Sequence, residues 1–398
     1  MTEAKTTNPI IPAPPRGFPE AEFEARLARA QRLMAERSVD GLLVMTEPEV
    51  RYFSGFFTQF WQSPTRPWFL VVPASAKPIA VIPEIGAECM ARTWIDDIRT
   101  WSSPHPSDDG VSLLKTTLTE VAGATGRIGI PMGRETNLRM PLIDLEEVRG
   151  ALLGVEFVDA TDIIRALRMI KSEAEIAKTM HICSIVSDAF EALPTFIAAG
   201  MTDIDAFRTF KIEVLDRGAD DVPYLSGGAD AGGYGDIISP PSGRVIAEGD
   251  VLMIDTGSLF DGYFSDFDRN YAFGHATDAA RRAYDVIYRA TENGLRAARP
   301  GATATDVFHA MEDVLQAGGS LGSDVGRLGH GLGMHLTEWP SNTATDGTVL
   351  EAGMILTLEP GMSFAPGKVM VHEEDLVIRE AGPELLTRRA PPELPIIG

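Results

Sequence analysis

Cysteine is scarce in this chain, acidic side chains outnumber basic ones, and long apolar runs are missing. Only Cys89 and Cys183 occur among 398 residues, without CxxC spacing, so neither a disulfide framework nor a thiolate metal site is indicated. With 35 Lys and Arg against 57 Asp and Glu, the net charge of −22 disfavours nucleic-acid and anionic-membrane partners. No stretch reaches the ~18 apolar residues of a membrane helix, and the N-terminus has no signal-peptide core. We therefore expect a cytoplasmic protein that binds neither nucleic acid nor membrane.

The chain is longer than one typical domain, and its sequence pattern changes along its length. A proline-rich arm is expected over residues 1–19, followed over 20–158 by an α/β domain in which apolar runs alternate with amphipathic helices. A helical connector over 159–172 leads into an α+β domain over 173–398. There, glycine-rich loops separate two predicted hairpins, one over 249–273 and one over 353–378.

Acidic side chains stand in or at the ends of apolar strands in this second domain. A carboxylate in such a place costs free energy unless it is paired or bound to a cation. Four carboxylates and one neutral imidazole carry a charge of −4, which two divalent cations balance; the candidates are Asp255, Asp266, His330, Glu359 and Glu374. Oxygen-rich ligation suits manganese, cobalt, iron or zinc more than copper. A pair of such ions activates water, so hydrolysis is the expected chemistry.

The segments IDTG, GYFSDFDR, GHGLG, TLEPGM and EED occur in the order typical of the pita-bread metallohydrolases, and the chain resembles that family, which includes aminopeptidase P, prolidase and creatinase. The resemblance implies an α/β creatinase-type N-terminal domain, an α+β pita-bread catalytic domain and a homodimer. It implies that the five residues bind two divalent ions, manganese before zinc, iron or cobalt, with Asp266 and Glu374 bridging. A metal-bound hydroxide would then attack a C–N carbonyl, with Glu359 or Glu374 carrying the proton.

Four positions around this expected centre depart from the family's pattern: Ile238 and Thr337 stand where the peptidases have histidines, His372 where they tend to have arginine, and Asp268 where they tend to have threonine. Residues two apart on a strand share a face, so Asp268 lies beside Asp266 and His372 beside Glu374. Both are candidate proton carriers. The alternatives are that Asp268 pairs with a cation and that His372 only supports a ligand. His335 is a candidate replacement for the absent histidine.

Aromatic residues are dense over 51–69, in the first domain. Such a stripe usually belongs to a core. The alternative is an aromatic wall for the neighbouring subunit's site, where cation–π contacts would hold a cationic head group. The candidate substrate-binding residues are Tyr52, Trp61, Thr337 and Trp339.

Three functions are compatible with these patterns. The first is a metal-dependent Xaa-Pro dipeptidase or aminopeptidase acting on a dipeptide or another small molecule. The second keeps the metal but acts on an osmolyte-type substrate, as creatinase, ectoine hydrolase or a dimethylsulfoniopropionate lyase does, and the missing histidines favour it. The third is a non-catalytic binding protein, which the retained ligand set disfavours.

Overall fold

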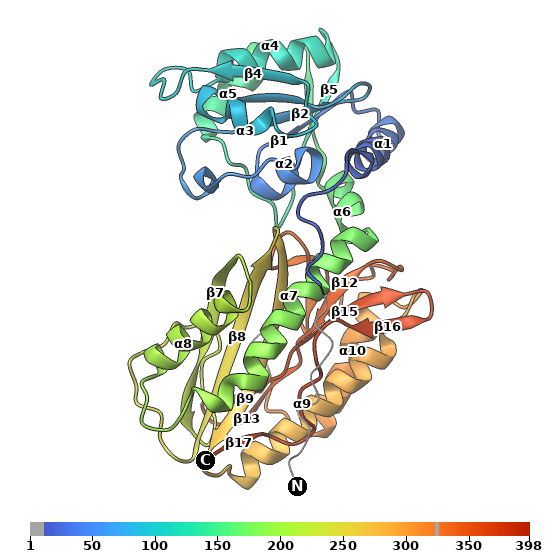
Figure 1. The fold of residues 1–398 in the computed structure, drawn as a ribbon. Helices are drawn as coiled ribbons and strands as arrows, with labels where there is room; N and C mark the ends of the chain where they lie inside the picture. Colours follow the sequence, from blue (N-terminus) through green and yellow to red (C-terminus); the bar gives the residue numbers. More distant parts are fainter. Residues whose placement is uncertain (1–11, 323–325) are drawn as a thin grey trace. The chain divides into compact units, whose positions relative to one another are not determined.

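The computed structural model describes residues 12–322 and 326–398, so most of the expected N-terminal arm, residues 1–11, lies outside the described residues. The chain forms two compact units (Figure 1), one of residues 16–168 and one that combines 169–398 with 12–15. The division falls inside the segment expected as a connector. Each unit has its own sheet and its own buried core.

A six-stranded mixed sheet in the order β4-β3-β2-β1-β5-β6 forms the first unit. Strand β1 is antiparallel to β2 and parallel to β5. Every residue of β1 is buried, as expected for a central strand covered on both faces. The strands are β1 (Gly41–Val44), β2 (Phe69–Pro73), β3 (Ile79–Pro83), β4 (Asp97–Trp101), β5 (Arg127–Ile130) and β6 (Glu156–Asp159). The helices are α1 (Glu20–Glu36), α2 (Glu47–Ser54), α3 (Ala87–Met90), α4 (Val111–Ala122), α5 (Leu142–Ala151) and α6 (Thr161–Met169).

The second unit contains a four-stranded sheet, β17-β9-β8-β7, a five-stranded sheet, β11-β10-β12-β15-β16, and the separate pair β13-β14. Helix α7 packs against β8 and β9, and α9 packs against α10 and against β12 to β14. The helices are α7 (Glu173–Ala192), α8 (Asp203–Asp216), α9 (Asp278–Ala297) and α10 (Ala304–Ala317). The strands are β7 (Asp221–Ala231), β8 (Asp250–Phe260), β9 (Tyr263–Phe273), β10 (His330–Gly331), β11 (Glu338–Ser341), β12 (Ile355–Leu358), β13 (Gly361–Ala365), β14 (Lys368–Val371), β15 (Glu374–Arg379), β16 (Gly382–Leu385) and β17 (Ile396–Ile397).

Local sequence signals explain where the main elements begin and turn. Helix α7 starts with a capping box, in which the Ser172 and Glu175 side chains each accept the other's backbone N–H. Strands β8 and β9 form the predicted hairpin. Its turn residues Asp261 and Gly262 both have positive φ, 47° and 82°, which a two-residue hairpin turn of this hand requires.

The second predicted hairpin is observed, but two residues on each side leave the strand pairing and divide it into two ladders in one register. Strand β12 pairs with β15 in the five-stranded sheet, whereas β13 pairs with β14. The interruptions face each other, at Glu359–Pro360 between β12 and β13 and at His372–Glu373 between β14 and β15. The His372 N–H donates to the Pro360 carbonyl there at 3.2 Å. Two glutamates are thereby released from regular strand geometry at one place. In the described ranges, no helix is long and apolar enough to cross a bilayer.

Candidate metal centre

The β8–β9 hairpin places three aspartates on one face of its sheet. In its register, Asp255 lies opposite Asp268, and Asp266 lies opposite Gly257. Because cross-strand partners, and residues two apart on one strand, share a face, all three carboxylates lie on the same side. The strand register of the predicted hairpin therefore brings Asp255 and Asp266 to one face of the sheet.

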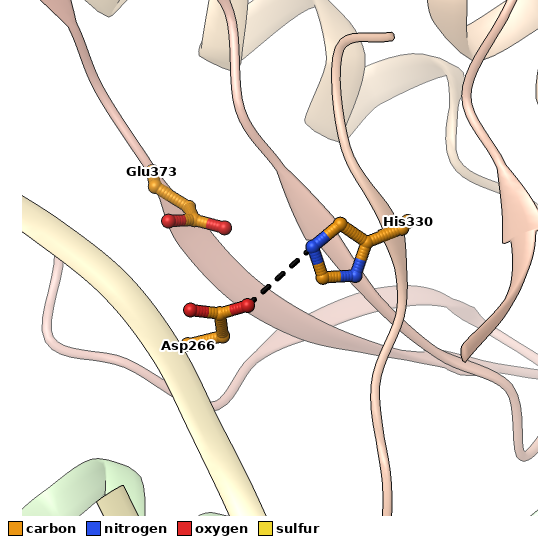
Figure 2. A group of neighbouring side chains, drawn as sticks. All are labelled: Asp266, His330 and Glu373. Atoms are coloured by element: carbon orange, nitrogen blue, oxygen red, sulfur yellow. Dashed lines mark ion pairs between the residues drawn. The ribbon is translucent and has the colours of Figure 1, made fainter. Parts of the chain in front are cut away.

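Asp266, His330 and Glu373 form the centre of the site (Figure 2). One ligand atom from each lies within 4.8 Å of the others, and all three side chains are buried. The His330 Nε2 atom is 3.4 Å from Asp266 Oδ2. The His330 Nδ1 atom is 2.9 Å from the Gly331 carbonyl, which only accepts, so Nδ1 carries the proton and Nε2 keeps its lone pair for a ligand.

Asp255 and Glu359 add two further carboxylates to this centre. Burial raises the pKa of each to about 7, although both side chains keep some contact with solvent. Burial, and then the charges of Asp255 and other acids, raise the pKa of Asp266 well above its usual value. The pKa of Glu373 is raised well above its usual value by burial and by Asp266, Glu359 and Asp255. The four carboxylates therefore lie close enough to repel one another.

This arrangement fits a divalent cation. Asp255 Oδ1 and Glu373 Oε1 are buried and have no hydrogen-bond partner in the described part of the chain. Buried, unpaired carboxylate oxygens are costly, and a cation among them removes that cost. Burial lowers the pKa of His330 to about 4, which keeps the imidazole neutral, the form that binds metal. The residues that would hold metal are Asp255, Asp266, His330, Glu359 and Glu373.

The expected ligand Glu374 is placed elsewhere. Its carboxylate is fully buried, and Oε2 accepts from Arg269 Nη2 at 2.9 Å and from the Thr387 hydroxyl, while Oε1 accepts from the Ala390 N–H at 3.0 Å. The residue before it, Glu373, is the one whose carboxylate lies within 4.8 Å of ligand atoms of Asp266 and His330. The structure thus brings Glu373 to the position that sequence reasoning gave to Glu374.

Asp268 and Asp375 hold the backbone around the site. Asp268 Oδ1 accepts the Glu373 N–H at 2.7 Å, and its other oxygen accepts from Asn270 at 3.4 Å. Asp375 Oδ2 accepts the Asp266 N–H at 3.0 Å and the Cys183 thiol at 3.2 Å. Both carboxylates therefore fix the strands that carry ligands. Asp268 has the supporting contacts of a positioning group, and its backbone carbonyl, not its carboxylate, accepts from Arg269.

The other histidine candidates lie around the centre in different settings. His372 Nδ1 is 2.9 Å from the Thr291 hydroxyl, and Nε2 is 3.6 Å from Glu374 Oε1, so this ring lies on the Glu374 side of the strand. Burial and the nearby Arg389 lower the pKa of His372 well below its usual value. His335 lies half-buried on the loop before β11, where its N–H donates to Glu338 Oε1 at 3.0 Å.

A buried ion pair anchors that loop. Lys171 Nζ is 3.1 Å from Glu338 Oε2, and Glu338 Oε1 also accepts the Met334 N–H at 2.8 Å. Thr337 is exposed and Trp339 is half-buried on the same segment. Ile238, which stands at the position of the other missing histidine, is exposed.

The aromatic candidates of the first unit have the contacts of core residues. Tyr52 is 1% exposed, its hydroxyl donates to the Leu167 carbonyl at 3.1 Å, and the Arg26 guanidinium covers its ring. Trp61 is buried against Trp68 at a ring distance of 6.0 Å. These contacts favour the core interpretation over a ligand-binding wall.

Two residues near the centre escaped sequence reasoning. Tyr224 lies opposite Gly257 in the β7–β8 register, and a Cβ on Gly257 would come within 2.2 Å of Leu336 Cδ1 and 3.2 Å of Tyr224 Cβ, so the glycine leaves room for both neighbours. The Tyr224 hydroxyl hydrogen-bonds Asp255 and accepts from Ser226 Oγ at 2.8 Å. Arg327 lies three residues before His330. The sequence signal for Arg327 was its place beside the glycine-rich motif. Tyr224 gave no such signal, because the pairing of β7 with β8 is what brings it near the centre.

The sequence comparisons agree with this geometry. Residues 177–380 match Metallopeptidase family M24, and residues 26–170 match the Creatinase/Prolidase N-terminal domain. The chain therefore belongs to metallopeptidase family M24 and is a metal-dependent hydrolase.

Several relatives match nearly the whole chain. Probable dipeptidase PepE of Mycobacterium tuberculosis is 28% identical over 394 residues, covering 96% of this chain and 98% of the relative. Xaa-Pro dipeptidase of Pyrococcus furiosus is 28% identical over 373 residues, covering 92% and 98%. The crystal structure of dipeptidase PepE from Mycobacterium ulcerans superposes with a TM-score of 0.84 at 28% identity, covering 96% and 99%. The predicted fold class, a creatinase-type domain followed by a pita-bread catalytic domain, is confirmed.

Proposed function

We propose that this enzyme hydrolyses Xaa-Pro dipeptides. The observation that carries the proposal is the convergence of Asp266, His330 and Glu373 beside Asp255 and Glu359, in a chain whose relatives include enzymes named dipeptidase and Xaa-Pro dipeptidase. Two bound divalent ions, with manganese first, are part of the proposal because they balance the four carboxylates of this ligand set, and oxygen ligands suit such ions. A cytoplasmic homodimer is likewise part of the proposal.

The metal ions, when bound, supply Lewis acidity and make water a better nucleophile near neutral pH. The protein's own groups position the reactants and move the proton. A Glu359 carboxylate oxygen accepts a proton from the attacking water while the water oxygen bonds to the scissile carbonyl carbon. The same group then returns the proton to the proline nitrogen as the C–N bond breaks.

The test is turnover of Xaa-Pro dipeptides by purified protein with added Mn²⁺, with Asp266→Asn as the matched control. We expect proline release that chelator and the Asp266→Asn substitution both abolish. Absence of turnover on every Xaa-Pro dipeptide, together with consumption of a quaternary or sulfonium metabolite, would replace this function with the osmolyte-type alternative.

A further inference from the structure

Arg327 places a cation beside the acidic centre. Its neighbour Leu328 is bound to the Glu359 backbone, since the Glu359 N–H donates to the Leu328 carbonyl at 3.1 Å. The Arg327 Nη2 group donates to the Thr337 hydroxyl at 3.2 Å. Thr337 is exposed and Arg327 is half-buried. The guanidinium therefore lies between the buried ligands and solvent.

The charge of Arg327 shifts the pKa of groups on three separate elements of the site. It lowers the pKa of Asp266 on β9 and of Glu359 after β12, which opposes the larger effect of burial. It also lowers the pKa of His330 on β10, which adds to the larger effect of burial. Arg269, by comparison, has its guanidinium committed to Glu374 and to three backbone carbonyls. In residues 12–322 and 326–398, Arg327 forms a hydrogen bond only to a neutral hydroxyl and has no carboxylate partner.

We propose that Arg327 binds the terminal carboxylate of the substrate and thereby selects free dipeptides over longer or amidated peptides. The inference rests on the proposed function, because in an Xaa-Pro dipeptide the carboxylate is attached to the carbon next to the scissile nitrogen. That carboxylate loses part of its hydration when the substrate enters the site, and a guanidinium beside it offsets this cost. The planar guanidinium matches a carboxylate with two parallel N–H donors.

The experiment compares two substrates and two arginine variants. The values of kcat/KM for an Xaa-Pro dipeptide and for the matching Xaa-Pro amide are measured for wild type, Arg327→Gln and Arg327→Lys, each loaded with Mn²⁺. A hydrogen bond to a charged group contributes about 1.5–3 kcal/mol, so Arg327→Gln is expected to lose roughly 10- to 100-fold on the dipeptide. The amide, which has no carboxylate, is expected to change less than about threefold, and Arg327→Lys keeps part of the preference.

Controls separate this role from a structural one. Arg289→Gln, on the exposed face of α9, replaces an arginine whose carboxylate partner in the described part of the chain is Asp285, four residues away, and it is expected to leave the turnover of both substrates unaffected. Binding of L-proline and L-prolinamide, measured by calorimetry, gives a readout independent of turnover, and Arg327→Gln is expected to weaken only L-proline. Equal losses on dipeptide and amide would overturn the inference. If wild type hydrolyses neither substrate, the proposed function itself has failed.

Discussion

Exchanging two adjacent glutamates for glutamine, one at a time, tests the ligand set directly. Glu373 has an unpartnered oxygen among Asp266, Asp255 and Glu359, whereas Glu374 is held by Arg269. Glutamine keeps the size of the side chain and removes its charge. Glu373→Gln is therefore expected to weaken metal binding and to leave the metal-free fold intact. Glu374→Gln is expected to destabilise the fold and to leave metal binding near normal.

The structure sets the size of the stability effect. Arg269 is 6% exposed, and Glu374 is its carboxylate partner at 2.9 Å. Removing one member of a buried ion pair costs about 3–5 kcal/mol, because the other charge stays buried. For a unit of this size, that loss lowers the melting temperature by roughly 6–20 °C. Glu373→Gln instead removes repulsion, so the metal-free protein is expected to melt at the same temperature or higher.

The assay combines thermal melting in chelator with calorimetric titration of Mn²⁺ at a temperature where both variants are folded. The account predicts a low melting temperature with near-normal metal binding for Glu374→Gln, and a normal melting temperature with lost metal binding for Glu373→Gln. If Glu374→Gln loses metal while Glu373→Gln keeps it, the ligand assignment is wrong.

Two further predictions concern pH and the tyrosine next to Asp255. The pKa values of Asp255 and Glu359 are raised to about 7 and that of Asp375 to about 8, so between pH 6.5 and 8 the metal-free folded state holds protons that the unfolded state has lost. The stability of the metal-free protein must therefore fall as pH rises through this window, where His330 and His372 are already neutral in the folded state. The affinity for Mn²⁺ must rise over the same range. Melting curves in chelator and in Mn²⁺ that fail to diverge would refute this. Tyr224→Phe keeps the ring but removes the hydrogen bond to Asp255, so Mn²⁺ affinity at pH 7 is expected to fall about 10-fold. An unchanged affinity by calorimetry would show that this hydroxyl does not support Asp255.

Much of the architecture is readable from local patterns. The β8–β9 hairpin follows from two strand-forming segments around an Asp-Gly turn, and its register places Asp255 and Asp266 on one face. Helix α9 (Asp278–Ala297) follows from the amphipathic period of its sequence, whose apolar positions are buried. These features depend on residues close together in sequence.

The fifth candidate ligand, Glu373, could not be predicted in the same way. Two glutamates stand side by side, and a shift of one residue in a strand reverses the face to which each points. The face is decided by Arg269, which holds Glu374 from 105 positions away in the sequence, and by Asp268, which holds the Glu373 N–H. Tyr224 and Arg327 were missed for the related reason that strand pairing and loop packing, and not spacing, bring them to the site.

The central claim is that these buried acidic residues bind divalent metal. It is tested most directly by the metal content of the full chain, measured by plasma mass spectrometry after incubation with Mn²⁺ and gel filtration, with Asp266→Asn treated identically. The account predicts stoichiometric manganese in the wild-type protein and little in the variant. Wild-type protein that emerges with no more manganese than Asp266→Asn would contradict it.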